Sequence, residues 1–218
     1  MDNTSLESQL QKAFEEVKLG IRSKLSISVR LESLKISDEQ TAMHSIRVAL
    51  KGKEIAKSGV YPITSSPKIM LFGGCLHDVG KTSINTELLK KDKNFSSKDM
   101  EEMRKHPIEG YELLKNNNYF SAIICLYHHY FSKDSYPSDS EIMKLEMKLG
   151  AKGLNLAKEY ARIIGVIDDY DAMSRKNDKF SPGKPEILSA VRRKEKLLEN
   201  HPQSRVLIKK LYDKSIFS

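Results

Sequence analysis

The chain has 218 residues, of which 39% are hydrophobic and 30% charged, a composition typical of a globular, mainly helical protein that argues against disorder. Its formal net charge of +8 favours anionic ligands, but no basic cluster interleaved with aromatics is present, so we do not expect it to bind duplex nucleic acid. The N-terminus lacks a signal-peptide pattern and no apolar run approaches about 18 residues, so we expect neither export nor membrane insertion.

The two cysteines, Cys75 and Cys125, lie singly within apolar runs. Isolated cysteines of this kind are typical of buried thiols in a reducing compartment and not of a disulfide framework. We therefore expect a cytoplasmic protein.

The N-terminal part of the chain has apolar residues at near-helical spacing between residues 5 and 34, although the pattern loosens at 26–30. It predicts a helical extension before the first motif. Ser37 and Gln40 then have the spacing of a capping box, which predicts a helix over 38–58.

The central part of the chain predicts three more helices. Segment 68–81, KIMLFGGCLHDVGK, indicates a largely buried helix whose glycines allow close packing, because it lacks the spacing of a phosphate loop. Ser96 and Asp99 predict a capped helix that ends near His106, since the following proline disfavours a helical predecessor. That proline suits the first turn of another helix over 107–116.

Two later apolar segments end in side chains of metal-ligand type. They are 121–130, which ends in His128 and His129, and 160–174, which carries Asp168, Asp169 and Asp171. A polar, turn-rich stretch follows, and 187–198 and 204–212 predict two closing helices. Every predicted element is helical, so the predicted fold class is all-α.

The histidines are unevenly placed. Five of the six lie on four apolar or capped helical segments, namely His44, His77, His106, His128 and His129, whereas His201 lies apart in the tail. For any single one, a satisfied core or surface histidine is the simpler interpretation, because a neutral imidazole needs only one hydrogen bond. The collection favours a shared site instead.

The ordered set of motifs resembles the HD superfamily of metal-dependent phosphohydrolases, and in particular its HD-GYP branch. The matching stretches are HSIRVA at 44–49, LHDVGK at 76–81, HPIEGYELL at 106–114, HHYFSKDSYP at 128–137 and DDYDAMSR at 168–175. A lone His-Asp pair would be weak support, but this ordered set spans about residues 38–178. The resemblance implies a helical bundle with a dinuclear metal site in its core.

The resemblance also implies a ligand set. One ion would be held by His44, His77, Asp78 and Asp168, and the second by bridging Asp78 with His106, His128 and His129. Imidazoles suit borderline metals and a carboxylate can bridge two ions. With these roles carried over from the family, iron or manganese is expected ahead of zinc, nickel, cobalt or magnesium. A hydroxide bridging the two ions would then attack phosphorus.

Other family roles fall on four further residues. Lys81 would contact a phosphate oxygen, with an exposed helix-end lysine as the alternative. Tyr136 and Arg175 would contact substrate, although Arg175 could instead cap a helix. Asp171 would orient a metal ligand or Lys81, unless it is a plain surface aspartate.

The resemblance predicts three parts of the chain: an N-terminal helical extension (1–37), a catalytic HD-GYP-like domain (38–180) and C-terminal helices packing on that domain (181–218). It implies a phosphodiesterase acting on a small-molecule nucleotide, namely cyclic di-GMP or a related cyclic dinucleotide.

The chain departs from the HD-GYP pattern at two places. Tyr130 takes the position of a glutamate after the paired histidines, and Ser135-Tyr136-Pro137 replaces the Gly-Tyr-Pro of a flexible lid. Losing the glycine changes the path open to the backbone, which puts cyclic di-GMP itself in doubt. Gln40 occupies the place of a third-metal glutamate, and because an amide is a poorer ligand we expect two metals.

Two further hypotheses keep the same residues. One is a non-catalytic module that binds a nucleotide or a partner through the altered lid, and the other is a mixed-valence diiron oxygenase of the HD superfamily. Lys81 and the basic charge argue for phosphate chemistry over oxygen activation, and the complete ligand set argues against an idle module.

Overall fold

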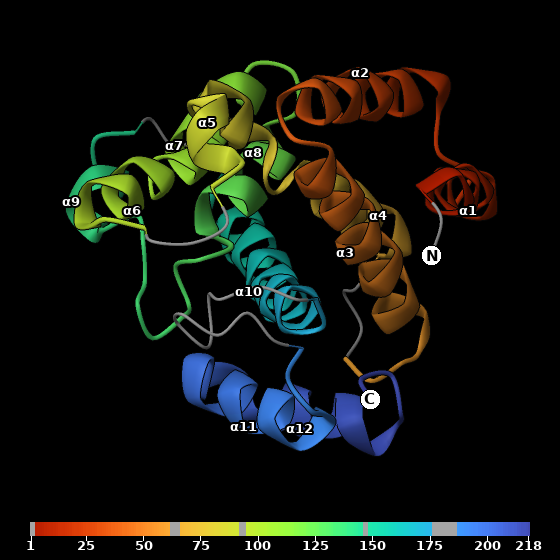
Figure 1. The fold of residues 1–218 in the computed structure, drawn as a ribbon. Helices are drawn as coiled ribbons and strands as arrows, with labels where there is room; N and C mark the ends of the chain where they lie inside the picture. Colours follow the sequence, from red (N-terminus) through yellow and green to blue (C-terminus); the bar gives the residue numbers. More distant parts are fainter. Residues whose placement is uncertain (1–2, 62–65, 92–94, 146–147, 176–186) are drawn as a thin grey trace.

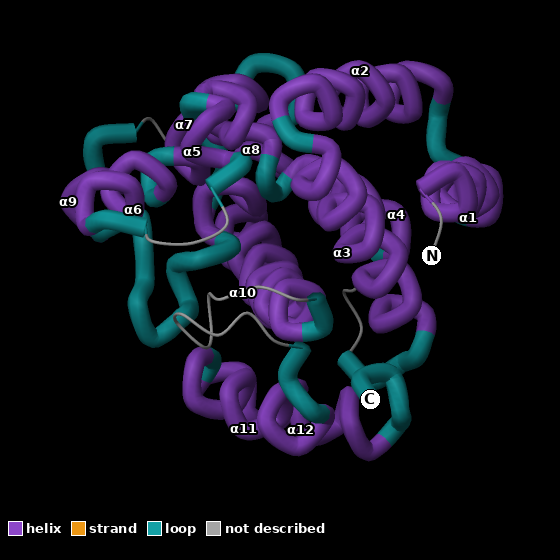
Figure 2. The backbone as a smooth tube through the Cα atoms, in the orientation of Figure 1, coloured by secondary structure: helices purple, strands orange, loops and turns teal. Residues whose placement is uncertain are grey.

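The computed structural model describes residues 3–61, 66–91, 95–145, 148–175 and 187–218. Every regular element in these ranges is helical (Figures 1 and 2), which confirms the all-α prediction. In chain order the elements are α1 (Asn3–Glu16), α2 (Ile21–Ser37), α3 (Glu39–Lys57), α4 (Pro67–Leu76), the 3₁₀ helix η1 (Val79–Ser83), α5 (Thr86–Leu89), α6 (Ser97–Met103), α7 (His106–Leu114), α8 (Tyr119–Tyr127), α9 (Asp139–Ile142), α10 (Ala151–Met173), α11 (Ala190–Asn200), η2 (Pro202–Ser204) and α12 (Arg205–Asp213). None of the helices in the described part is both long and apolar enough to cross a membrane.

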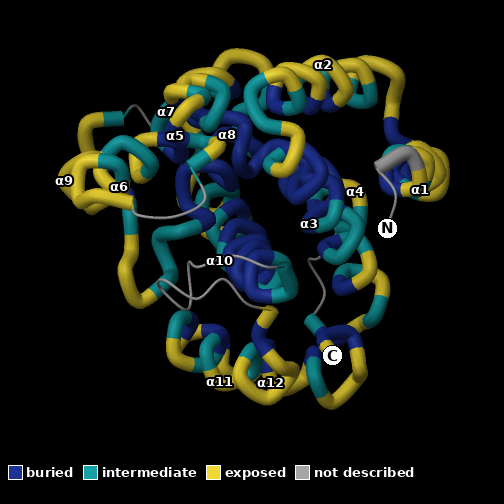
Figure 3. The backbone as a smooth tube through the Cα atoms, in the orientation of Figure 1, coloured by how far each residue is buried: buried dark blue, intermediate teal, exposed yellow. Residues whose placement is uncertain are grey.

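The longest helix, α10, runs through the middle of the molecule (Figure 1) and contacts α3, α4 and α8. Its side chains Ile163, Ile164, Val166 and Ile167 are at most 1% exposed. Figure 3 shows that α3 and α10 are buried along most of their length, whereas α2 is largely exposed on its outer side. The helices that carry the candidate ligands are therefore the ones anchored in the core.

The N-terminal extension is helical and consists of two helices, with a break between them at residues 17–20. Gly20 is the N-cap of α2, and Lys18 in the connection has φ 50°. Both helices bury an apolar side: Leu10 and Phe14 of α1 and Ile27 of α2 are at most 4% exposed. α1 packs on α3, and α2 packs on α3, α4 and η1, so both belong to the same core.

The cap of α3 differs from the prediction. Asp38, in an extended conformation, is the N-cap and accepts a hydrogen bond from the amide of Thr41 at 2.8 Å. Ser37 is instead the last residue of α2, where its hydroxyl donates to the carbonyl of Ser33. The capping box of Ser37 and Gln40 was therefore wrong, because α2 extends up to the residue before the carboxylate that caps α3.

The predicted capping box of α6 is confirmed. The Ser96 hydroxyl accepts from the amide of Asp99, and the Asp99 carboxylate accepts from the amide of Ser96. α6 ends at Met103, and α7 begins at His106 with Pro107 in its first turn, close to the predicted boundary.

The helix predicted over 68–81 ends as an α-helix at Leu76 and continues as η1. His77 occupies the C-cap position, and Asp78 has φ −102° and ψ 7°, outside regular helix geometry. In a 3₁₀ turn, residues three apart eclipse one another. Lys81 therefore lies over Asp78.

The C-terminal helices α11 and α12 lie below α10 in Figure 1 and begin and end within three residues of the predicted ranges. α11 contacts both α10 and α12. The division of the chain into three parts remains a prediction, and its boundary at 180/181 lies outside the described residues.

Two glycines permit the close crossings that bring the motifs together, as the sequence predicted for the first of them. A Cβ at Gly74 of α4 would lie 2.5 Å from the Cα of Ala49 in α3. A Cβ at Gly165 of α10 would lie 2.1 Å from the carbonyl oxygen of His128. Asp168 follows one turn after Gly165, so this crossing sets how close that carboxylate comes to the histidines.

We expect Gly165→Ala to lower the free energy of unfolding by about 1–3 kcal/mol, because the new methyl group collides with backbone that has no room to move. Gly153→Ala in the same helix is the matched control. Its Cβ would meet only the Leu149 side chain, at 3.6 Å, so it should raise stability by up to about 1 kcal/mol through helix propensity. Urea unfolding, followed by far-ultraviolet circular dichroism, measures the free energy of unfolding of both variants. A Gly165→Ala protein as stable as wild type would contradict the close contact between α10 and the backbone of His128.

Candidate metal centre

The candidate ligands come from five elements and meet in one place. They are His44 in the second turn of α3, His77 and Asp78 at the end of α4, His106 at the start of α7, His128 and His129 at the end of α8, and Asp168 in α10. All except the partly buried His129 are buried, with at most 6% of their surface exposed. The helix ends bring side chains inward while the helix bodies pack the apolar core.

Asp78 lies at the centre of this group. Its Oδ2 is 3.4 Å from Nε2 of His77 and 3.8 Å from Nε2 of His44. Its Oδ1 is 3.3 Å from Nε2 of His106 and 3.9 Å from Nε2 of His128. One carboxylate therefore faces four imidazoles, two on each oxygen, which is the placement required of a carboxylate shared by two cations.

Asp168 is the second carboxylate of the group. Its Oδ1 lies 2.9 Å from Nε2 of His44, and its Oδ2 lies 3.7 Å from Nε2 of His129. Each of the five histidines thus has Nε2 within 4 Å of Asp78 or Asp168, and all seven predicted ligands are brought together.

Three of the imidazoles are oriented in the same way by the backbone. In each, Nδ1 lies at hydrogen-bonding distance from the carbonyl three residues earlier, namely His77 from Gly74 (2.8 Å), His106 from Met103 (2.7 Å) and His128 from Cys125 (2.5 Å). Because a carbonyl only accepts, each Nδ1 carries a proton and donates. When such a ring is neutral, its Nε2 lone pair points into the site, as a metal ligand requires.

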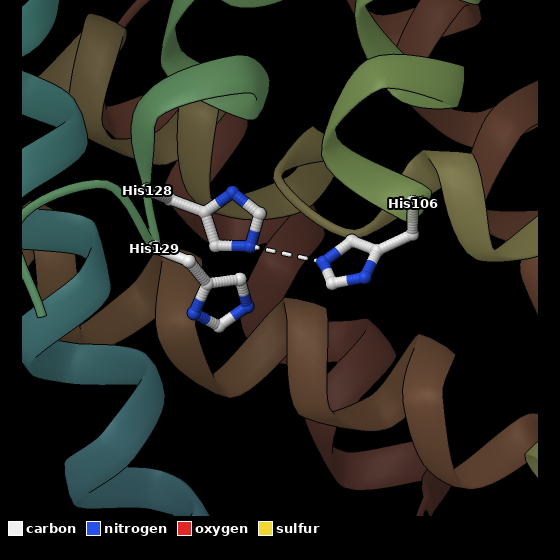
Figure 4. Close-up of side chains that lie close together, drawn as sticks. All are labelled: His106, His128 and His129. Carbon is white, nitrogen blue, oxygen red and sulfur yellow. Dashed lines mark hydrogen bonds between the residues drawn. The ribbon is translucent and has the colours of Figure 1, made fainter. Parts of the chain in front are cut away.

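These lone pairs face one another without donors between them. Nε2 of His106 lies 3.3 Å from Nε2 of His128 (Figure 4). Nε2 of His77 and Oδ1 of Asp78 are buried and have no hydrogen-bond partner. Buried acceptors without donors are costly, and bound cations would satisfy them.

Three sets of ligand atoms lie within 4.8 Å of one another and could each hold a metal ion: His44 with His77 and Asp78, His77 with His128 and Asp168, and His106 with His128 and His129. His44 and His77 of the first set lie near Oδ2 of Asp78, whereas His106 and His128 of the third set lie near Oδ1. The donor types, imidazole nitrogen and carboxylate oxygen, fit first-row transition metals.

Burial and charge shift the protonation of these groups in different directions. Burial lowers the pKa of His106 to about 4 and that of His128 to about 3. Burial also disfavours the charged form of His77, but the Asp78 and Asp168 carboxylates outweigh it and raise its pKa. Burial would raise the pKa of Asp78, but Lys81, His77 and His106 hold it well below its usual range. The carboxylate is therefore ionised and two of the imidazoles are neutral, as ligands must be.

Asp171 supports His44 from the outside. Its Oδ2 lies 2.7 Å from Nδ1 of His44, and its Oδ1 accepts from Nε of Arg47 at 2.7 Å. His44, Arg47 and the other nearby charges outweigh burial and lower the pKa of Asp171. Asp171 thus contacts a histidine and not Lys81, and it is not a plain surface residue. Arg47 was missed by the sequence analysis, although it lies one turn after His44 on the same helix.

Comparison with known proteins agrees with this geometry. A family model described as HD domain matches residues 41–173, more than half of the chain. The chain belongs to the HD domain family. Residues 44–173 of that match include all seven ligand positions and Asp171.

Two curated relatives match about half of this chain. The cyclic di-GMP phosphodiesterase PA4108 of Pseudomonas aeruginosa is 29% identical over 120 residues, which are 53% of this chain and 28% of that protein. The cyclic di-GMP phosphodiesterase response regulator RpfG of Xanthomonas campestris pv. campestris is 33% identical over 111 residues, 49% of this chain and 26% of that protein. The matches thus cover little more than a quarter of either relative. The resemblance to an HD-superfamily, HD-GYP-like phosphohydrolase domain is confirmed.

The predicted substrate residues of the HD domain occupy different surroundings. Lys81 donates from Nζ to Oδ2 of Asp78 at 2.7 Å, so it is not a free helix-end lysine. Tyr136 stacks on His129, with ring centroids 4.5 Å apart, and lines a cavity of about 350 Å³. Arg175 lies on the far side of His44, with Nε 3.0 Å from Asp171. Their contacts with substrate remain predictions.

His201, which the sequence analysis set apart from the other histidines, belongs to none of the three candidate metal sets found in the described part of the chain, but it is buried beside them. His201 is 2% exposed, and its Nε2 lies 3.0 Å from Oδ2 of Asp169, the residue after Asp168. Asn200 also donates to Asp169, at 3.2 Å. No motif or periodicity predicts a contact between residues 32 apart that are joined only by tertiary packing.

The low pKa values of His106 and His128 make the stability of the metal-free HD domain pH-dependent. In the unfolded chain both imidazoles titrate near 6.5, so below that pH the unfolded state binds more protons than the folded state. The stabilisation is complete above pH 6.5 and is lost as the pH falls towards 4. We expect a slope of up to about 1.4 kcal/mol per pH unit for each imidazole.

Urea unfolding of EDTA-treated protein between pH 4.5 and 7 measures this slope. His77, whose pKa is raised, opposes this slope only near and above the unfolded value of about 6.5, where its ring is protonated in the folded state and titrates in the unfolded state. Well below that pH the ring is protonated in both states and adds no slope. His128→Gln should reduce the slope by about half. A stability that does not change between pH 6.5 and 5 would contradict the neutral, buried state of the two rings.

Proposed function

We propose that this HD domain is a metal-dependent phosphodiesterase that hydrolyses a cyclic dinucleotide, either cyclic di-GMP or a related nucleotide. The observation that carries the proposal is the position of Asp78, with two imidazoles near each carboxylate oxygen. The named activity of both curated relatives supports the substrate class. The small-molecule nucleotide is the partner that the basic net charge favours.

The proposed ligand set follows the two sides of Asp78. His44, His77 and Asp168 would hold one ion with Asp78, and His106, His128 and His129 would hold the other. We propose iron or manganese, since mixed imidazole and carboxylate donors suit these metals. Two bound cations would lower the pKa of water and neutralise charge on the phosphoryl oxygens.

The protein's own groups would orient and neutralise the substrate. The backbone carbonyls of Gly74, Met103 and Cys125 fix the rings they contact, and Asp171 fixes His44, so these four imidazoles are already oriented. Lys81 would move its ammonium group from Asp78 to a phosphate oxygen once cations compensate that carboxylate. Tyr136, and Arg175 behind His44, remain proposed substrate contacts.

The cytoplasmic location predicted from the cysteines is part of the proposal. Cys75 and Cys125 are both free and buried. Burial raises the pKa of each thiol well above its usual range, which keeps both thiols protonated and unreactive.

We expect Asp78→Asn to abolish turnover of bis-p-nitrophenyl phosphate and of a cyclic dinucleotide panel by protein loaded with Mn²⁺ or Fe²⁺. A neutral amide cannot bridge two cations, so the variant should also retain less than half the metal after dialysis. Asp213→Asn, at the exposed end of α12, is the matched control and should behave as wild type. Metal content is measured by plasma mass spectrometry alongside the rates.

The outcomes separate the hypotheses. Wild-type protein that binds metal without hydrolysing any phosphodiester contradicts the proposal and supports a regulatory module or an oxygenase. Wild-type protein that takes up no transition metal contradicts the metal centre itself.

A second test concerns Lys81. Lys81→Met should lower kcat/KM for bis-p-nitrophenyl phosphate about 10²- to 10³-fold, the loss typical of one donor to transition-state charge, while leaving metal content unchanged. Lys90→Met, which removes an exposed lysine after the short helix α5, is the control. An unchanged rate would assign Lys81 to the structural support of Asp78 alone.

A further inference from the structure

A cavity of about 350 Å³ opens beside the metal centre, next to His129. Among the candidate ligands, His129 alone lines it, together with Tyr136 from the altered lid segment. Other walls come from the end of α6, which carries Arg104, and from α11, which carries Lys196 and Asn200. Its volume is at the lower end of the range for small-molecule sites.

The wall formed by α11 lies outside the family match, which ends at residue 173. It is held in place by buried and backbone contacts. His201 and Asn200 both bond to Asp169, and the carbonyl of Asn200 accepts from the amide of Lys133 at 2.8 Å. One wall of the cavity is therefore formed by a part of this chain that lies outside the matched HD domain.

The charges around the cavity are largely paired. Glu199 accepts hydrogen bonds from both Lys133 and Lys196, and Asp169 accepts from His201 and Asn200. Asp134, also on the lining, adds negative charge near Lys133.

Arg104 differs from these charged residues. Its exposed guanidinium lies over the ring of Tyr136, 5.5 Å from the centroid, and no ion pair to a carboxylate is found for it in the described part of the chain. The Tyr136 ring stacks in turn on His129 at an interplanar angle of 26°. A row of planar groups thus leads from the cavity mouth to the metal centre, with the guanidinium outermost.

We propose that this cavity is the subsite for the distal nucleotide of the substrate, and that Arg104 recognises its phosphate. The inference rests on the proposed phosphodiesterase function and extends it to a specificity-determining residue. A guanidinium pairs bidentately with phosphate oxygens, and its position over Tyr136 pre-orients it for that contact. A cyclic dinucleotide carries a second phosphate beyond the scissile one, whereas bis-p-nitrophenyl phosphate does not.

Isothermal titration of the metal-loaded 218-residue chain tests the subsite. The ligands are slowly hydrolysed phosphorothioate analogues of cyclic di-GMP, cyclic di-AMP and cyclic GMP-AMP. Arg104→Gln should weaken the tightest of these ligands about 10-fold, and Arg104→Lys should weaken it less, because charge remains but the planar fork is lost. Lys105→Gln, adjacent in sequence and paired with Glu102, is the matched control and should bind as wild type.

Three outcomes would overturn the subsite. Arg104→Gln could bind as tightly as wild type, Arg104→Gln and Lys105→Gln could lose the same amount of affinity, or wild type could bind none of the three analogues. Hydrolysis of bis-p-nitrophenyl phosphate by wild-type protein is scored separately. Turnover of that compound with an unaffected Arg104→Gln affinity leaves the proposed function intact and removes only the subsite. If wild-type protein does not hydrolyse that compound but Arg104→Gln binds the analogues more weakly, the nucleotide subsite stands and the proposed phosphodiesterase function is contradicted.

Discussion

The structure is organised around a buried carboxylate surrounded by imidazoles. Asp78 is 1% exposed and has the Nε2 atoms of four histidines within 4 Å, and its hydrogen-bonded cation is Lys81. An ionised carboxylate in a dry core is unfavourable unless positive charge lies close by. The buried acceptors that lower the stability of the metal-free protein are also the groups suited to bind cations. Stability and metal affinity therefore depend on the same cluster around Asp78.

The protein holds this cluster with its backbone as much as with its side chains. The Nδ1 protons of His77, His106 and His128 are each bound by a carbonyl three residues earlier, at or near a helix terminus. Carbonyls near helix ends have no complete set of intrahelical partners, so they are available to these rings. At each of these three histidines, the carbonyl left without an intrahelical partner at the end of the helix is therefore the group that orients the ring.

The C-terminal helices extend this organisation beyond the family's common region. The bond between Asp169 and His201 joins α10, beside Asp168, to the turn after α11. This places α11 against the cavity that His129 and Tyr136 line. A tail that packs on the scaffold in this way can change which substrate is accepted without changing the ligands, because rim residues and metal ligands lie on different elements.

The sequence by itself determined the helical class, most element positions and the residues of the candidate metal centre, because apolar periodicity, caps and an ordered set of histidines and aspartates are local signals. It placed the cap of α3 at Ser37 instead of Asp38, continued α4 through Asp78, and did not predict the contact of His201 with Asp169. Only the tertiary structure decided which oxygen of Asp78 faces which ring, that Arg47 supports Asp171, and that Arg104 lies over Tyr136. These are contacts between segments far apart in the chain, or turns shaped by such contacts, and their geometry is fixed by packing, which no local pattern encodes.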